Sequence, residues 1–210
     1  MKKIYKNIII DNVQSFFQLP VRGVDTIYSC RKFVGVPDGA YLYTDVISLE
    51  KLERDKSKDR FSYILGRLEE TPQQYYNMYR KNEDLLAKLS LLKMSKSTES
   101  MLGCFNYENI KEKRTKNFKY LNERLSKLNK LNLKNVTGAY AYPLYIDNAE
   151  RLRKKLIDEN IFVPVLWPNV IKDNKSINAY NFAKNILPLP CDQRYGIEEM
   201  DKIMKIVKEI

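Results

Sequence analysis

Three short apolar runs near the beginning of the chain predict β-strands. They cover residues 7–11, 26–30 and 41–44, and the first of them ends in a carboxylate. Short runs of β-branched and aromatic residues are typical of strands, and the first run resembles a strand buried in a parallel sheet. Ligands of α/β sheets bind at the carboxyl ends of strands, so the polar residues that follow these runs are candidates for a site.

A helical pattern replaces the strand pattern after these runs. Thr71 and Pro72 suit the N-cap and the first position of a helix over about 72–90. Its apolar stripe would consist of Tyr75, Met78, Tyr79, Leu85, Leu86 and Leu89. The small and polar stretch from Ser95 to Ser100 is a candidate connector between two lobes.

The second half of the chain is expected to alternate helices and strands. The expected elements are a helix over about 108–131, a strand over 139–146, a helix capped by Asp147 or Asn148, a strand over 162–167, and a helix over about 197–209. Pro164 makes the strand over 162–167 an edge strand or an irregular one. We therefore predict an α/β protein with two domains, residues 1–95 and 101–210.

Composition narrows the possible classes of protein. The chain is 44% hydrophobic and 11% aromatic, which is typical of a folded protein. No apolar run approaches the roughly 18 residues that cross a bilayer, and no secretory signal is present, so we expect a cytoplasmic protein that binds no membrane. Histidine is absent, and Cys30, Cys104 and Cys191 are widely separated, so we expect no metal site.

The net charge of +11 allows a nucleic-acid-binding protein as one alternative. The most basic segment, residues 111–134, also carries Phe118, Leu121, Leu125 and Leu128 at helical spacing. Its lysines would therefore occupy the solvated face of a helix. Because an anionic substrate would explain the same charge, we expect no nucleic acid as a partner.

The candidate chemistry lies in two segments, Ile8 to Phe17 and Tyr28 to Asp45. A carboxylate and an amide three residues apart, Asp11 and Gln14, follow the first strand. The second strand ends in Ser29, and Lys32 follows it. Taken singly, these residues are ordinary turn, loop or surface residues. Their order and spacing form the signal.

In that order and spacing the chain resembles the DegT/DnrJ/StrS-type sugar aminotransferases, which are fold-type I pyridoxal-phosphate enzymes. The matching segments are Asp11 to Gln14, Ser29 to Lys32, and Asp38 to Ala40, where Ala40 stands in place of a glycine. Gly138 to Asp147, Phe162 to Pro168 and Ile186 to Ile203 resemble the C-terminal domain of that family. The resemblance implies a remnant of the large cofactor-binding domain followed by a small α/β domain.

The resemblance also implies the cofactor, pyridoxal 5'-phosphate, and roles for four residues. Lys32 would hold the cofactor covalently and act as the catalytic base. Asp11 would keep the pyridine nitrogen protonated, Gln14 would lie near the 3-oxygen of the ring, and Ser29 would bind the phosphate. The substrate would be a keto sugar linked to a nucleotide, with an amino donor such as glutamate.

The N-terminal half of the family pattern has no counterpart in this sequence. It contains a glycine- and threonine-containing phosphate loop and the aromatic residue that stacks on the cofactor ring. We therefore expect a truncated or split enzyme that forms a homodimer or pairs with a chain supplying the missing half. On this hypothesis the 210-residue chain alone binds the cofactor poorly and is inactive. The alternative is a non-catalytic remnant or partner subunit with the same fold.

Overall fold

The computed structural model describes residues 5, 7–46, 51–134, 136–173 and 175–209. The chain divides into two compact units, Met1–Asn106 (unit 1) and Tyr107–Ile210 (unit 2). The polar stretch that we expected to connect two lobes forms regular structure instead. Helix α3 (Lys96–Leu102) begins there, with the hydroxyl of Ser95 accepting a hydrogen bond from the Thr98 backbone at 3.1 Å. Small hydroxyl residues favour helix N-caps as well as loops, so their composition alone did not separate the two readings.

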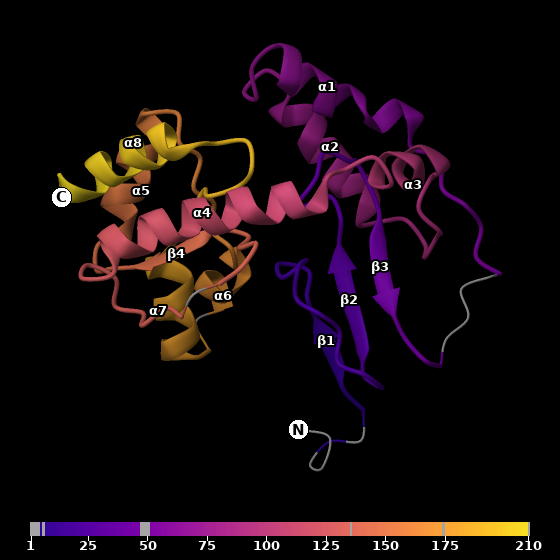
Figure 1. Ribbon diagram of the computed structural model, residues 1–210, viewed down its shortest axis with the longest axis horizontal. Coiled ribbons are helices and arrows are strands. Elements are labelled where there is room, and N and C mark those ends of the chain that lie inside the picture. The colour runs from indigo at the N-terminus through magenta and orange to yellow at the C-terminus, as the bar shows by residue number, and fades with distance from the viewer. Residues whose placement is uncertain (1–4, 6, 47–50, 135, 174, 210) are drawn as a thin grey trace. The chain divides into compact units, whose positions relative to one another are not determined.

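The three predicted strands of unit 1 are confirmed, and they form one sheet in the order β1-β2-β3 (Figure 1). The strands are β1 (Ile9–Asp11), β2 (Asp25–Ser29) and β3 (Ala40–Tyr43). β1 runs parallel to β2, and β3 runs antiparallel to it. The expectation of a buried first strand is wrong for the side chains of β1, because Ile9 is 70% exposed.

The helical part of unit 1 consists of a 3₁₀ turn (Lys58–Arg60), α1 (Ser62–Glu69), α2 (Tyr76–Leu86) and α3. The helix predicted over 72–90 is therefore shorter than expected. Thr71 does not cap it, because four turn residues separate Thr71 from the start of α2. The Thr71 hydroxyl instead donates a hydrogen bond to the side chain of Gln74 at 2.9 Å. The expected apolar stripe is largely solvent-facing, with Met78, Leu85 and Leu89 exposed.

Unit 2 packs five helices around a two-stranded antiparallel sheet in its described residues. Its elements are α4 (Tyr107–Leu125), β4 (Tyr142–Tyr145), α5 (Ala149–Asp158), α6 (Pro168–Asp173), α7 (Ile177–Asn185), β5 (Ile186–Leu189) and α8 (Ile197–Lys208). The helices expected to begin at 108, 149 and 197 are confirmed. Asn148 occupies the N-cap position of α5 in a left-handed conformation, without a side-chain cap.

The strand predicted over 162–167 is wrong, because this segment has no strand structure. The strand that pairs with β4 is β5, which places Pro143 opposite Pro188. Proline lacks the backbone N–H that a ladder requires, so the prolines concealed this pairing from pattern analysis. Opposed residues of an antiparallel pair alternate between hydrogen-bonded and non-bonded positions, and two prolines are compatible only with the latter.

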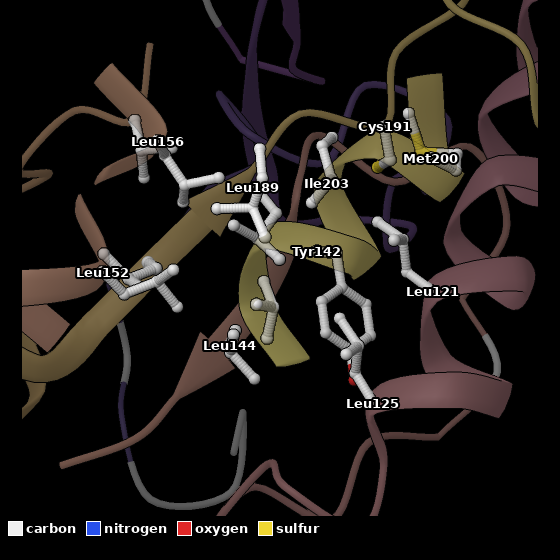
Figure 2. Close-up of a cluster of buried hydrophobic side chains, with 14 of the residues drawn as sticks. Leu121, Leu125, Tyr142, Leu144, Leu152, Leu156, Leu189, Cys191, Met200 and Ile203 are labelled. Atoms are coloured by element: carbon white, nitrogen blue, oxygen red, sulfur yellow. The ribbon is translucent and has the colours of Figure 1, made fainter. Parts of the chain in front are cut away.

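The core of unit 2 is formed by residues at helical spacing that meet the two strands (Figure 2). Leu121 and Leu125 of α4 lie beside the buried ring of Tyr142, and Leu152 and Leu156 of α5 lie on the side of Leu144 and Leu189. The solvated-face prediction for α4 is confirmed, since its buried leucines alternate with exposed lysines such as 113, 116 and 119. No helix in the described residues combines the length and the apolar character needed to cross a membrane.

Candidate active site

The parallel pairing of β1 with β2 brings the candidate residues to one end of the sheet. Asp11, the last residue of β1, lies opposite Ile27, and Ser29 ends β2 two residues further on. Lys32 follows in the turn that leaves β2. Carboxyl ends of parallel strands lie at the same end of a sheet, so the backbone segments that carry Asp11, Ser29 and Lys32 come together there.

The turn after β1 is held by its own backbone and by the carboxylate that begins it. Asp11 Oδ1 accepts a hydrogen bond from the Val13 N–H at 2.9 Å, and Asn12 extends the ladder with an N–H bond to Ile27 O at 2.9 Å. Asp11 is exposed, whereas Gln14 is partly buried in the same turn. The carboxylate therefore has a fixed origin and remains accessible to a ligand.

Aromatic rings join the turn after β1 to the turn after β2. Phe16 stacks on Phe33 with ring centroids 5.4 Å apart, and Phe17 meets Phe33 edge-on at 5.9 Å. Phe33 is 2% exposed and is the residue after Lys32. Because Phe16 lies two residues after Gln14, this packing fixes the two candidate segments against each other.

A polar contact reinforces the same junction. The hydroxyl of the buried Tyr28, in β2, donates to Gln18 O at 2.9 Å and receives a 3.4 Å contact from the amide of Asn12. Both partners belong to the segment that follows β1. The tyrosine thus satisfies buried polar atoms on that segment and holds it onto β2.

The amine of Lys32 lies in an environment that favours its neutral form. Burial lowers the pKa of Lys32, and the adjacent guanidinium of Arg31 lowers it further, while Asp11 and Glu83 act in the opposite direction. The Asp11 carboxylate is thus one of two acidic groups that partly offset the lowering of the Lys32 pKa. A lysine with a lowered pKa is a better nucleophile and base near neutral pH.

The turn before β3 is built around a buried ion pair. The Arg60 guanidinium contacts Asp38 at 2.9 Å and also pairs with Asp55, and Asp38 is 5% exposed. Gly39 has φ +97°, and a Cβ there would lie 2.9 Å from the Thr98 methyl group, so glycine is required. Ala40 is the extended first residue of β3, which explains why alanine is tolerated where the family resemblance suggested glycine.

Several residues that shape this edge were not identified from the sequence. Arg31 forms an ion pair with Glu83 of α2, and Phe33 packs with Phe16. Arg31 was visible only as the neighbour of Lys32. Its partner lies 52 residues away, a separation at which sequence spacing carries no signal.

Comparisons with known proteins address the fold. No protein-family model matches the sequence, and no curated protein matches it. Among solved structures, it is similar to the sugar aminotransferase CalS13 from Micromonospora echinospora, with a TM-score of 0.58 and 9% identity, over 97% of this chain and 58% of that one. DesV from S. venezuelae, solved in complex with a ketimine intermediate, gives a TM-score of 0.59 and 13% identity over 97% and 57%.

A third similar structure is a DegT DnrJ EryC1 StrS aminotransferase from Brucella abortus, with a TM-score of 0.52 and 16% identity over 97% of this chain and 57% of that chain. The chain therefore spans 57–58% of the length of these three structures. At these identities the likeness concerns the fold. Over that part of their length, this chain has the α/β fold of the DegT/DnrJ/EryC1/StrS sugar aminotransferases.

Proposed function

We propose that this chain carries the lysine-bearing part of a pyridoxal-phosphate site and belongs to an enzyme that transfers an amino group to a keto sugar. The observation that supports the proposal best is the shared edge of β1 and β2. Asp11 and Lys32 leave two parallel, hydrogen-bonded strands at the same end, and the carboxylate acts on the pKa of the amine.

The donor set at this edge is compatible with the cofactor. Bound pyridoxal phosphate supplies an aldehyde that a lysine amine can hold and a pyridine ring that withdraws electrons from the substrate. Lys32 has a partly buried amine with a lowered pKa, as attachment to an aldehyde requires. Asp11 is an exposed carboxylate of fixed origin, and Ser29 offers a hydroxyl at the end of the next strand.

On this proposal each residue handles a proton or a charge. The Asp11 carboxylate would accept a hydrogen bond from the protonated ring nitrogen and stabilise its positive charge. Lys32 Nζ, when released, would act as the base that carries a proton between the substrate carbon and the cofactor. Ser29 would donate to the phosphate, and Gln14 would lie beside the 3-oxygen of the ring.

We further propose that the acceptor is a nucleotide-linked keto sugar and that glutamate is the amino donor. Two of the similar structures are described as sugar aminotransferases or as members of the DegT group. The net charge of +11 would favour the approach of an anionic nucleotide sugar. The net charge would attract all nucleotide sugars alike, so it does not indicate which sugar is the acceptor.

Trapping the cofactor on the purified 210-residue chain tests the proposal. The chain is mixed with excess pyridoxal phosphate, reduced with borohydride, digested and mapped by mass spectrometry. Because the 210-residue chain alone is expected to bind the cofactor poorly, the expected result is a low but selective yield of pyridoxyl group on Lys32. This label should be lost in Lys32→Ala and retained in Lys113→Ala, which removes an exposed lysine of α4. Labelling spread evenly over exposed lysines would contradict the proposal.

A non-catalytic partner subunit is the second candidate, and the coverage of 57–58% favours considering it. Because the likeness extends over only this part of the solved structures, we propose that turnover requires the rest of the fold as well, which the test supplies as a second polypeptide. Amino transfer from glutamate by the 210-residue chain alone would refute this requirement. Labelling of Lys32 without turnover, in the presence of such a polypeptide, would favour the partner subunit.

A further inference from the structure

We infer that the ion pair between Arg31 and Glu83 positions Lys32, by anchoring the turn that carries the amine and by holding two opposite charges beside it. The inference rests on the proposed function, because it concerns the amine assigned there to the cofactor. It gives roles to two residues that the proposed function leaves without one.

The ion pair anchors the turn to a helix. Arg31 Nη1 bonds the carboxylate of Glu83, in α2, across 52 residues of sequence, and both side chains are 27% exposed. Charge-assisted hydrogen bonds are shorter and stronger than those between neutral groups. Since Arg31 precedes Lys32 in the chain, the anchor fixes the backbone from which the amine extends.

A second contact from the same helix holds the other end of the segment. The amide of Asn82, which is 5% exposed, donates to Pro37 O at 3.1 Å. Two adjacent residues of α2, Asn82 and Glu83, therefore bond the segment at Pro37 and at Arg31. Between these two points, Phe33 is buried against the aromatic rings that follow β1. A segment held at both ends and in its middle gives Lys32 a defined origin.

The charges that act on Lys32 come from three elements. Arg31 lowers the pKa of its amine after burial, the largest cause, while Asp11 of β1 and Glu83 of α2 raise it. Arg31 and Glu83 thus act on the amine with opposite sign.

The buried tyrosine and thiol near the ion pair add no further charge beside Lys32 at neutral pH. Burial raises the pKa of Tyr63, in α1, to about 12, with Arg31, Glu83, Tyr79 and Arg67 as further influences. The Tyr63 phenol is therefore neutral at neutral pH. Burial and the Asp38 carboxylate likewise raise the pKa of the adjacent Cys30 thiol to about 12, so it adds no charge beside Lys32.

The test is the reactivity of Lys32 in the full chain without cofactor. Trace labelling with acetic anhydride, read by peptide mass spectrometry from pH 7 to 10, reports the neutral fraction of each lysine. Glu83→Gln removes a charge that favours the ammonium form, and at pH 8 it should raise the labelling rate of Lys32 about threefold to tenfold. Arg31→Gln removes the opposing charge and should lower this rate by a similar factor.

Matched variants separate this effect from a general loss of structure. Glu99→Gln removes the ion pair with Arg54 in the same unit and should leave the rate unchanged. Glu83→Asp keeps the charge and should restore most of the original rate. The exposed Lys113 and Lys119 of α4 serve as internal references in every sample. Circular dichroism verifies that each variant is folded.

Two outcomes overturn the inference. The first is a change in the same direction for Glu83→Gln and Arg31→Gln, which a purely structural role would produce. The second is a change smaller than twofold in both. Because the labelling is done without cofactor, either result is independent of pyridoxyl trapping. A chain whose exposed lysines are labelled evenly in the trapping test, but whose two variants show opposite changes, would reject the proposed function and keep this inference.

Discussion

The two units of the chain differ in how they are held together. Among the described residues, unit 1 buries eight hydrophobic side chains and exposes 14 large ones, whereas unit 2 buries 18 and exposes seven. Unit 2 has a continuous core, which includes Tyr142, Leu144 and Leu189 from its two strands. Unit 1 relies on an aromatic cluster and on ion pairs such as Arg60 with Asp38.

This difference indicates which of the two units can hold a ligand-binding site. Close packing in unit 2 leaves its side chains few alternative positions, as is typical of a scaffold. Unit 1 instead places carboxylates, amines and guanidinium groups at the ends of short strands, where they meet solvent. Groups that must bind a ligand need this access, and the cost is a smaller contribution of apolar burial to stability.

The largest effect is expected from a cavity in the core of unit 2. Leu152→Ala, at a fully buried position of α5, should lower the free energy of unfolding by about 2–5 kcal/mol. The single tryptophan, Trp167, lies in unit 2, so its fluorescence during urea denaturation reports on that unit. Leu128→Ala, at a position 48% exposed, is the control and should change stability by less than about 0.5 kcal/mol. If both variants lost the same free energy of unfolding, the expected difference between a core and a surface position would be contradicted.

A smaller effect is expected from the buried ion pair of unit 1. Asp38→Asn leaves the Arg60 guanidinium with Asp55 as its remaining acidic partner, and should cost about 2 kcal/mol, below the usual cost of breaking a buried pair. Hydrogen–deuterium exchange of peptides from residues 25–43 would locate the loss in unit 1. The control, Asp147→Asn, removes the exposed pair with Lys130 and should leave exchange unchanged.

The reactivity of the two buried thiols should report how easily each unit opens locally. Burial is the main cause that raises the pKa of Cys30, in unit 1, and of Cys191, in unit 2, to about 12. Both are fully buried, whereas Cys104 is exposed. In a Cys104→Ser chain, a thiol reagent should modify Cys30 at least about tenfold faster than Cys191, because unit 1 opens at lower free energy. Mass spectrometry of the modified peptides measures the two rates.

The pH dependence identifies the state that reacts in this experiment. A thiol exposed by local opening regains its ordinary pKa of 9.0, so the rate should rise up to about pH 9 and then level off. Reaction within the folded structure would instead continue to accelerate towards pH 12. Equal rates for Cys30 and Cys191 would contradict the proposed difference between the units.

The smallest change in the free energy of unfolding is expected at β1, the outermost described strand of its sheet. Ile9→Ala, at a position 70% exposed on β1, should change the free energy of unfolding by less than about 0.5 kcal/mol. The matched substitution in unit 2 is Ile203→Ala, at a position 2% exposed on α8, and should cost about 2–5 kcal/mol. Urea denaturation followed by circular dichroism measures both. A loss above about 1.5 kcal/mol for Ile9→Ala would indicate that another surface covers β1 in solution.

Local patterns were sufficient to predict the strands of unit 1 and the helices that begin near 108, 149 and 197. In each case the side chains of one element carry the signal, as with the buried stripe of α8. The strand predicted over 139–146 is confirmed as β4, whereas its partner β5 was missed because Pro188 weakens the strand pattern there. Helix α1 was missed as well, and its two buried residues, Tyr63 and Gly66, form too short a stripe to recognise.

The candidate site divides in the same way. Asp11, Ser29 and Lys32 became candidates because their order and spacing after two predicted strands resemble the family pattern. The contacts that hold them, such as Arg31 with Glu83, join residues far apart in the sequence. Such contacts depend on how helices pack onto the sheet, and no local pattern encodes that packing. Their roles towards a cofactor remain predictions for the trapping experiment.

The position of β1 has a consequence for any molecule that touches both Asp11 and Lys32. β2 has a hydrogen-bonded strand on each side, whereas β1 is the outermost described strand and pairs over three residues. A ligand that contacts both side chains would link the two strands. Separation of β1 from β2 would weaken binding of the ligand, and binding would in turn reduce this separation, because the two processes are thermodynamically linked. Any interaction that stabilises the β1–β2 pairing should therefore raise the affinity for the ligand.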